Sequence, residues 1–160
     1  MGSGQKNNSS WYIPGASTVV MAAGRGLPEN VRGVIADCPY SSTKRIIVKV
    51  MRDKHVPVHF AYPLLRAATR ILGGFDPNKV EIAEYASRIK VPLMLIHGDR
   101  DGFVPFEMSR EIYDAAPGAE LHIFAGAAHA MSYMTDIEKY ERRTKEFLMK
   151  ILGDDLSQNI

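Results

Sequence analysis

The stretch Val91–Pro105 reads VPLMLIHGDRDGFVP, and it decides the fold. A mostly apolar run is followed at once by a polar turn that contains two glycines and two aspartates. A short apolar run closed in this way is typical of a strand buried on both faces of a parallel sheet. The polar residues therefore stand just past the strand end, where open α/β sheets carry their ligand-binding and catalytic side chains.

Two other short runs predict strands, at residues 31–37 (VRGVIAD) and 120–124 (ELHIF). Apolar residues at helical spacing predict helices between and after the strands, over residues 61–72, 108–115 and 137–151. Strands that alternate with helices in this way indicate parallel pairing with crossover helices. The expected fold class is α/β, with a partial parallel sheet of about three strands and flanking helices.

The segment 43–88 differs, because about three helical patterns follow one another there without a strand. We interpret it as a helical cap insertion over the edge of the sheet. Its first helix, Thr43–Lys54, is strongly basic, which would suit a membrane or a nucleic acid. A solvated face with the apolar residues turned inward is the favoured interpretation.

The composition indicates one globular domain: the chain has 160 residues, of which 46% are hydrophobic and 24% charged. A net charge of +2 predicts no nucleic-acid partner, and no apolar run is long enough to predict a membrane span. Cys38 is the single cysteine, which excludes an internal disulfide and favours a cytoplasmic location. We expect a disordered leader or tag at 1–10, a single domain at 11–153 and a tail at 154–160.

The residues after the second and third predicted strands suggest acid–base chemistry. Asp101 follows one strand, and His129 follows the next. A carboxylate can hold an imidazole in one tautomer and stabilise its cation, while the imidazole deprotonates a nucleophile. The pair is therefore a candidate for the acid and base of a nucleophilic hydrolase.

These segments resemble a known superfamily. HGDRDGFVP is similar to the H-G-x-x-D-x-x-V-P segment of the α/β hydrolases, and AGAAHAMSY, residues 125–133, is similar to their catalytic-histidine loop. The resemblance covers about Tyr12 to Leu152 and includes the cap insertion. It implies an esterase- or peptidase-type serine hydrolase, with Asp101 as triad acid and His129 as general base. No cofactor and no metal are implied.

Alternatives remain for the acid and for the other histidines. Asp99 and Asp37 also follow predicted strands, and some members of the superfamily carry their acid at the position of Asp37. His97, at a strand end, is predicted to be a structural hydrogen-bonding residue. The remaining histidines show no metal-ligand spacing: His55, His59 and His122.

The nucleophile is the weak point of the resemblance, because the chain has no G-x-S-x-G elbow. Aligning Gly15 and Thr18 with the family pattern puts Ile13 at the serine position and Pro14 directly after it. Isoleucine has no nucleophilic atom, and proline has no N–H for an oxyanion hole. Losing one such donor costs a factor on the order of 100 to 1000 in rate.

Two other residues could be considered as nucleophiles. Ser17 lies in a broken motif, GASTV, where we favour a small residue in the first turn of a helix, with a possible capping role. Cys38 follows Asp37 at a strand end, where a small buried thiol is the favoured interpretation.

Two hypotheses follow. The first is a hydrolase-derived protein that acts on small-molecule esters or amides, with Asp101 and His129 in place and weak or no activity in this chain. The second is a non-catalytic, truncated or engineered α/β scaffold that folds and self-associates. The strands that precede the nucleophile in relatives have no counterpart, so an open sheet edge near residues 31–37 predicts a homo-oligomer.

Overall fold

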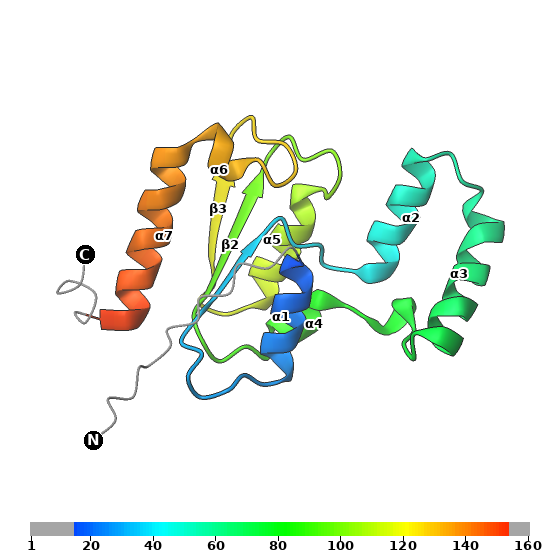
Figure 1. Cartoon of the computed structure of the whole chain (residues 1–160), viewed down its shortest axis with the longest axis horizontal. Coiled ribbons are helices and arrows are strands. Elements are labelled where there is room, and N and C mark those ends of the chain that lie inside the picture. The colour runs from blue at the N-terminus through cyan, green and yellow to red at the C-terminus, as the bar shows by residue number, and fades with distance from the viewer. Residues whose placement is uncertain (1–14, 154–160) are drawn as a thin grey trace, which may run out of the picture.

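The computed structural model describes residues 15–153, so the predicted leader, the predicted tail, Ile13 and Pro14 lie outside the described residues. Helices and strands alternate along most of this range (Figure 1). The elements in chain order are α1 (Ala16–Arg25), β1 (Val34–Asp37), α2 (Thr43–Asp53), α3 (Val58–Leu72), η1 (Pro77–Lys79), α4 (Ile82–Ala86), β2 (Leu93–Gly98), α5 (Phe106–Ala115), β3 (Glu120–Phe124), α6 (Ser132–Thr135) and α7 (Ile137–Leu152).

The three strands form one parallel sheet in the order β1-β2-β3, which confirms the predicted fold class. In the register, Ala36 pairs with Leu95, and Leu95 pairs with Leu121. The strand β2 begins two residues later than predicted, after Pro92. Proline has no N–H for the sheet ladder, whereas its carbonyl still accepts the N–H of Val34.

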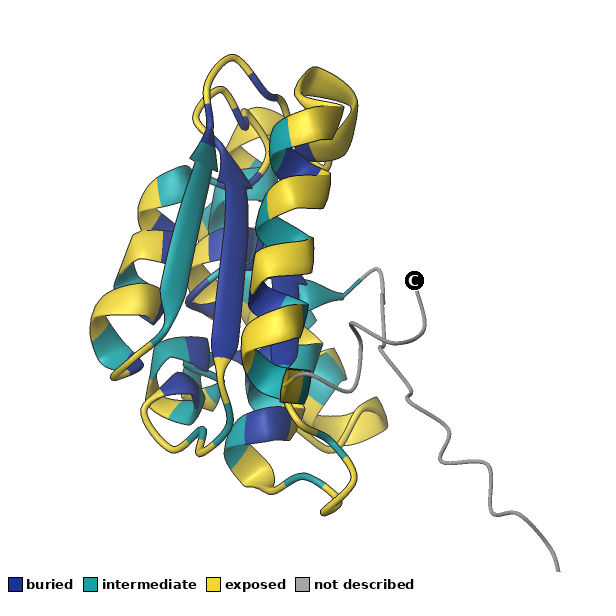
Figure 2. Ribbon diagram, turned by 90° about the vertical axis from the view of Figure 1, so that its left-hand side faces the viewer, coloured by how far each residue is buried: buried dark blue, intermediate teal, exposed yellow. Residues whose placement is uncertain are grey.

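Both faces of the sheet are covered. On one face, Val20 of α1, Ile82 of α4 and Ile112 of α5 pack against Leu95 of β2 in one core cluster. On the other face, α7 packs against β2 and β3 in a second cluster. The central strand β2 is buried along its whole length, whereas β3 is half-buried for most of its length (Figure 2). This double coverage explains the continuous apolar run in the sequence of β2.

The helices α2 and α3, here called the arm (residues 43–72), extend away from the sheet (Figure 1). Ser42 begins α2, since its hydroxyl accepts the N–H of Arg45 at 3.4 Å. Ile46 is the buried apolar residue of α2 and packs with Val104 and Met108. By contrast, α3 has no buried residue. The run of helices predicted for residues 43–88 is present, and its role as a cap stays a prediction.

Within residues 15–153, no helix combines the length and the apolar character needed to cross a bilayer.

Candidate active site

The loops that follow the three strands meet at one edge of the sheet, because parallel strands end on the same side. Asp37 is the last residue of β1, and Cys38 follows it in the loop after this strand. The loop after β2 carries Asp101, and the loop after β3 carries His129. Residues separated by up to 92 positions in the chain are thereby brought into contact. The backbone N–H of Ala130, for example, lies 3.4 Å from the Sγ of Cys38.

The carboxylate of Asp101 makes three hydrogen-bond contacts at this edge of the sheet. Its Oδ1 accepts the backbone N–H groups of Phe103 at 2.9 Å and Val104 at 2.8 Å, and its Oδ2 lies 2.7 Å from Nδ1 of His129. Burial alone would raise the pKa of this carboxyl. The hydrogen bonds from His129 and the two N–H groups outweigh that effect and lower the pKa below its ordinary value. Asp101 is therefore an ionised, oriented acceptor.

His129 is held on one side and open on the other. The contact with Asp101 uses Nδ1, so Nε2 is the ring nitrogen left to face a reactant. The side chain is 40% exposed, and the ring of Phe103 lies against it with 5.0 Å between ring centroids. This is the arrangement that a general base requires, with a carboxylate orienting the imidazole behind its free nitrogen.

The loops of Asp101 and His129 are tied to each other by the residues around them. Asp99 accepts the N–H of Gly126 at 2.6 Å, and Arg100 donates its N–H to the carbonyl of Ala127 at 3.1 Å. Gly98 lies so close to this loop that a Cβ built on it would be 2.2 Å from the carbonyl oxygen of Ala127. The carboxylate of Asp99, the first alternative acid, thus bonds to the backbone of the histidine loop at Gly126 and not to the side chain of His129.

Asp37, the second alternative acid, has other partners. Its Oδ1 accepts from the Cys38 thiol at 3.1 Å, and its Oδ2 accepts from the Tyr140 hydroxyl at 3.3 Å. Burial raises its pKa despite these hydrogen bonds. Asp37 therefore makes no hydrogen bond to His129 among the described contacts, and Asp101 is the carboxylate paired with the imidazole.

Cys38 is buried, as predicted, and its backbone is in the left-handed region with φ 56°. Burial, followed by the charge of Asp37, raises the pKa of the thiol far above its usual range. A protonated thiol is a poor nucleophile and a poor metal ligand. Its Sγ and ligand atoms of Asp101 and His129 lie within 4.8 Å of one another, and they are the three residues here that could surround a metal ion. In the structure, Asp101 and His129 are bonded to each other instead.

His97 has the structural role predicted for it. The ring is fully buried, with Nδ1 2.6 Å from the hydroxyl of Ser109 and Nε2 2.9 Å from the carbonyl of Val104. Val104 thus contacts His97 through its carbonyl and Asp101 through its N–H. Strand-end position could not point to Ser109, because this residue lies inside α5. Phe103 follows β2 in the same loop as Asp101, but no pattern in the sequence indicates that its ring packs against His129.

Ser17 is not available as a nucleophile. It is buried, its hydroxyl donates to the carbonyl of Tyr40 at 3.0 Å, and it accepts the N–H of Tyr40 at 2.7 Å. Ser17 lies in the first turn of α1, as predicted, but the capping role is wrong, because Gly15 is the N-cap of α1 and no side chain caps this helix. Ser17 instead joins α1 to the loop after β1.

Comparisons with known proteins find a matching family and several similar sequences. The sequence model of the family described as serine aminopeptidase, S33, matches residues 47–136. The chain is 25% identical over 136 residues to the uncharacterized protein YqkD of Bacillus subtilis, which covers 84% of this chain and 45% of that protein. It is 30% identical over 73 residues to the pimeloyl-[acyl-carrier protein] methyl ester esterase of Vibrio atlanticus, covering 46% of this chain and 28% of that protein.

Solved structures show the same fold. The esterase Pf2001 of Pyrococcus furiosus matches with a TM-score of 0.63 and 23% identity, over 87% of this chain and 52% of that one. Est1E of Butyrivibrio proteoclasticus matches with a TM-score of 0.57 and 19% identity, over 87% of this chain and 58% of that one. The chain spans about half the length of such relatives, 45% of YqkD and 52% of Pf2001.

Proposed function

The chain belongs to the serine aminopeptidase S33 family of α/β hydrolases, and we propose that Asp101 and His129 are the acid and base of a hydrolytic site for carboxylic esters or amides. One observation carries the proposal: Oδ2 of Asp101 lies 2.7 Å from Nδ1 of His129, which leaves Nε2 of the ring to the substrate side. The lowered pKa of Asp101 supports it, because an ionised partner stabilises the imidazolium that forms when the base takes a proton.

The chemistry follows from these two residues. Nε2 of His129 removes a proton from an attacking hydroxyl or water as the new bond to the carbonyl carbon forms. The proton then passes from the imidazolium to the leaving alcohol or amine as the old bond breaks. Asp101 stays ionised throughout and holds the ring in place.

The nucleophile limits the expected rate. The family alignment puts Ile13 at the serine position, and Ser17 is held by the backbone of Tyr40. Water activated by His129 is then the nucleophile that these residues support, and we expect weak hydrolysis. A cytoplasmic, reducing setting would suit the buried free thiol of Cys38.

Esters are the substrate class to test first. Two of the similar proteins are esterases by name, and one of them acts on a methyl ester. Apolar residues of α3 favour an apolar acyl group, if this helix lines the substrate pocket as a cap would.

The test is turnover of p-nitrophenyl acetate and butyrate by the whole chain beside His129→Ala. General bases contribute about 100-fold or more, so the rate should fall by that factor or reach the uncatalysed background. Asp101→Asn should reduce the rate as well, because the imidazolium loses its charged partner. His122→Ala, on β3 beside Glu120, is the matched control and should keep the wild-type rate. Equal rates in wild type and His129→Ala would contradict the proposal.

A second candidate function is self-association without catalysis, and the edge position of β1 favours it. Val34 and Cys38 donate their N–H groups to the β2 side, so by alternation the N–H of Ile35 points away from β2. Among residues 15–153, no strand pairs with that side. An open edge is a template for pairing with a second copy.

Light scattering after size-exclusion chromatography tests the second candidate. We expect a mass above 17.8 kDa that rises with protein concentration. Ile35→Pro removes the outward N–H without touching the β2 ladder and should return the chain to the monomer mass. A mass of 17.8 kDa at every concentration would exclude self-association.

A further inference from the structure

The outer face of α3 is an exposed apolar stripe. Phe60, Leu64, Ile71 and Leu72 are between 69% and 86% exposed. Together with the exposed Pro63, Ala67 and Ala68, these residues form a series in which members three and four positions apart follow one another, so they share one side of the helix. Apolar side chains scattered singly on a surface are ordinary, but a continuous row over four turns indicates a contact surface.

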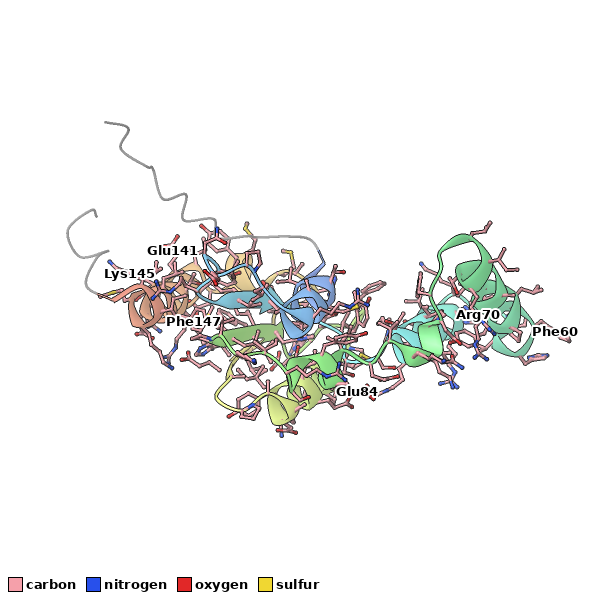
Figure 3. All side chains as sticks on the ribbon, turned by 90° about the horizontal axis from the view of Figure 1, so that it is seen from below. Phe60, Arg70, Glu84, Glu141, Lys145 and Phe147 are labelled. Atoms are coloured by element: carbon pink, nitrogen blue, oxygen red, sulfur yellow. The ribbon has the colours of Figure 1, made fainter. Side chains whose placement is uncertain are left out.

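The other side of α3 already has its partners. Arg66 forms a bidentate ion pair with Asp76, in which Nη2 donates to Oδ2 at 2.7 Å and Nε donates to Oδ1 at 2.9 Å. The hydroxyl of Tyr62 bonds to Asn78. The stripe lies away from these contacts, and Figure 3 shows Phe60 at the outer end of the arm, pointing away from the rest of the chain.

The charge of the arm is the second observation, and it is independent of the stripe. Residues 43–72 contain seven lysines and arginines against one carboxylate, Asp53, whereas the rest of the chain has thirteen against seventeen. Three of the seven cations form ion pairs, with Glu111, Asp53 and Asp76. Within residues 15–153 the other four have no ion-pair partner: Lys44, Arg52, Lys54 and Arg70.

The stripe and the cations fit one kind of surface. Arg70 falls beside the stripe on the helix, so a cation borders the apolar face there. A helix of this type lies in the plane of a membrane interface, with its apolar side among the acyl chains and its cations at the headgroups. A nucleic acid would use the cations but leave the aliphatic stripe in water.

We propose that the outer face of α3 docks the arm on a membrane surface that contains anionic phospholipid. The sequence alone favoured apolar residues turned inward and no membrane partner. Ile46 of α2 does turn inward, but the stripe of α3 does not. The proposal does not rest on the hydrolytic site, because docking requires neither Asp101 nor His129.

Vesicle co-sedimentation of the whole chain tests the proposal. We expect binding to vesicles made from equal parts phosphatidylcholine and phosphatidylglycerol, and at least tenfold weaker binding to phosphatidylcholine alone, since each cation near an anionic surface contributes roughly fivefold. Raising the salt from about 0.1 M to about 1 M should weaken binding to the mixed vesicles, because the Debye length falls to about 3 Å.

Variants separate the stripe from the charge. Leu64→Asp with Ile71→Asp should abolish binding to the mixed vesicles, and Lys54→Glu with Arg70→Glu should weaken it by at least tenfold. The matched control is Tyr113→Asp with Met149→Asp, which puts the same change on exposed apolar residues of α5 and α7 and should bind as wild type does. Because α3 has no buried residue, the stripe variant should keep the wild-type Tm.

Two results would overturn the proposal. One is absence of binding to the mixed vesicles, or binding that the stripe variant leaves unchanged. The other is a free protein whose mass by light scattering falls to that of a monomer on Leu64→Asp with Ile71→Asp, which would show that a second copy of the chain covers the stripe.

Discussion

Gly98 shows why one residue of the H-G-x-x-D segment has to be small. Its backbone φ is not in the left-handed region, so the requirement comes from space and not from conformation. A Cβ at this position would be 2.2 Å from the carbonyl oxygen of Ala127, a backbone atom of the loop that carries His129 two residues later. The close approach of β2 to that loop brings the acid and the base together.

Gly98→Ala should therefore destabilise the protein and displace the histidine loop. We expect a loss of about 1–3 kcal/mol in the free energy of unfolding, the usual range for overpacking, measured by urea unfolding. Gly102→Ala is the matched control, because a Cβ there meets no atom within 4 Å and should change stability by less than about 0.5 kcal/mol. Equal effects of the two substitutions would contradict this account.

Two carboxylates of the site, the half-buried Asp37 and the buried Asp101, should respond to pH in opposite directions. Burial raises the pKa of Asp37, so its contribution to stability is complete below about pH 3.8 and is lost as the pH rises through the raised pKa. The pKa of Asp101 is lowered, so its contribution is present above that pH and is lost as the pH falls through the lowered value.

Asp37→Asn should therefore raise Tm at pH values above the raised pKa of the wild-type carboxyl, and the gain should shrink as the pH falls through that pKa and vanish below about pH 3.8. Thermal unfolding followed at several pH values measures the difference. Asp114→Asn, on the exposed side of α5, is the control and should show no such pH dependence. A lower Tm for Asp37→Asn near pH 8 would show that the contacts with Cys38 and Tyr140 need the charge.

Strand-end spacing led to Asp101 and His129 and to the structural role of His97, because parallel strands bring their carboxyl ends together. The same reasoning could not rank the three carboxylates by contact. Which one meets the imidazole depends on loop conformation, including the left-handed backbone of Cys38 and Ala130. Nor could it find Ser109, which reaches His97 from the middle of α5.

Among the elements, α2 depends most on its first residue. The hydroxyl of Ser42 accepts the N–H of Arg45 and donates to the carboxylate of Glu81 at 2.9 Å, and the residue is buried. It thus starts the helix and joins it to the segment before α4. The N-terminal end of the arm is fixed at this point.

Ser42→Ala should cost about 1 kcal/mol in the free energy of unfolding for the lost cap, and it also removes the hydrogen bond to the half-buried Glu81. Urea unfolding measures the loss. Ser87→Ala, which removes an exposed hydroxyl that bonds only to Glu84 of the preceding turn, is the control and should be near neutral. A neutral Ser42→Ala would mean that water replaces both bonds.

Element types were predictable where periodicity is strong, and their ends were less so. The third strand was predicted with its observed bounds, whereas β1 begins three residues later than predicted and β2 begins after Pro92. The exposure of α3 was not predictable. Helical periodicity indicates that one face is apolar, but it does not say what lies against that face.

At the scale of the whole molecule, the sequence predicted the fold because alternating strands and helices leave few arrangements. In a parallel sheet with the order β1-β2-β3, right-handed crossovers place their helices on one face, and here α4 and α5 lie on the same face together with α1. The helix α7 follows the last strand and covers the other face. The placement of the arm is a different matter. It depends on a few polar contacts made at its base, which no pattern in the sequence specifies.

One of those contacts joins the arm to the acid loop. Nζ of Lys49, on α2, donates to the carbonyl of Gly102 at 2.6 Å, one residue past Asp101. Binding that displaces the arm therefore changes the conformational equilibrium of the turn that orients Asp101. A rearrangement of that turn changes the equilibrium of the arm by the same free energy, because thermodynamic coupling is reciprocal. A hydrogen bond from a charged donor contributes about 1.5–3 kcal/mol, so this single contact limits the coupling between the arm and the acid loop to roughly 10- to 150-fold in either direction.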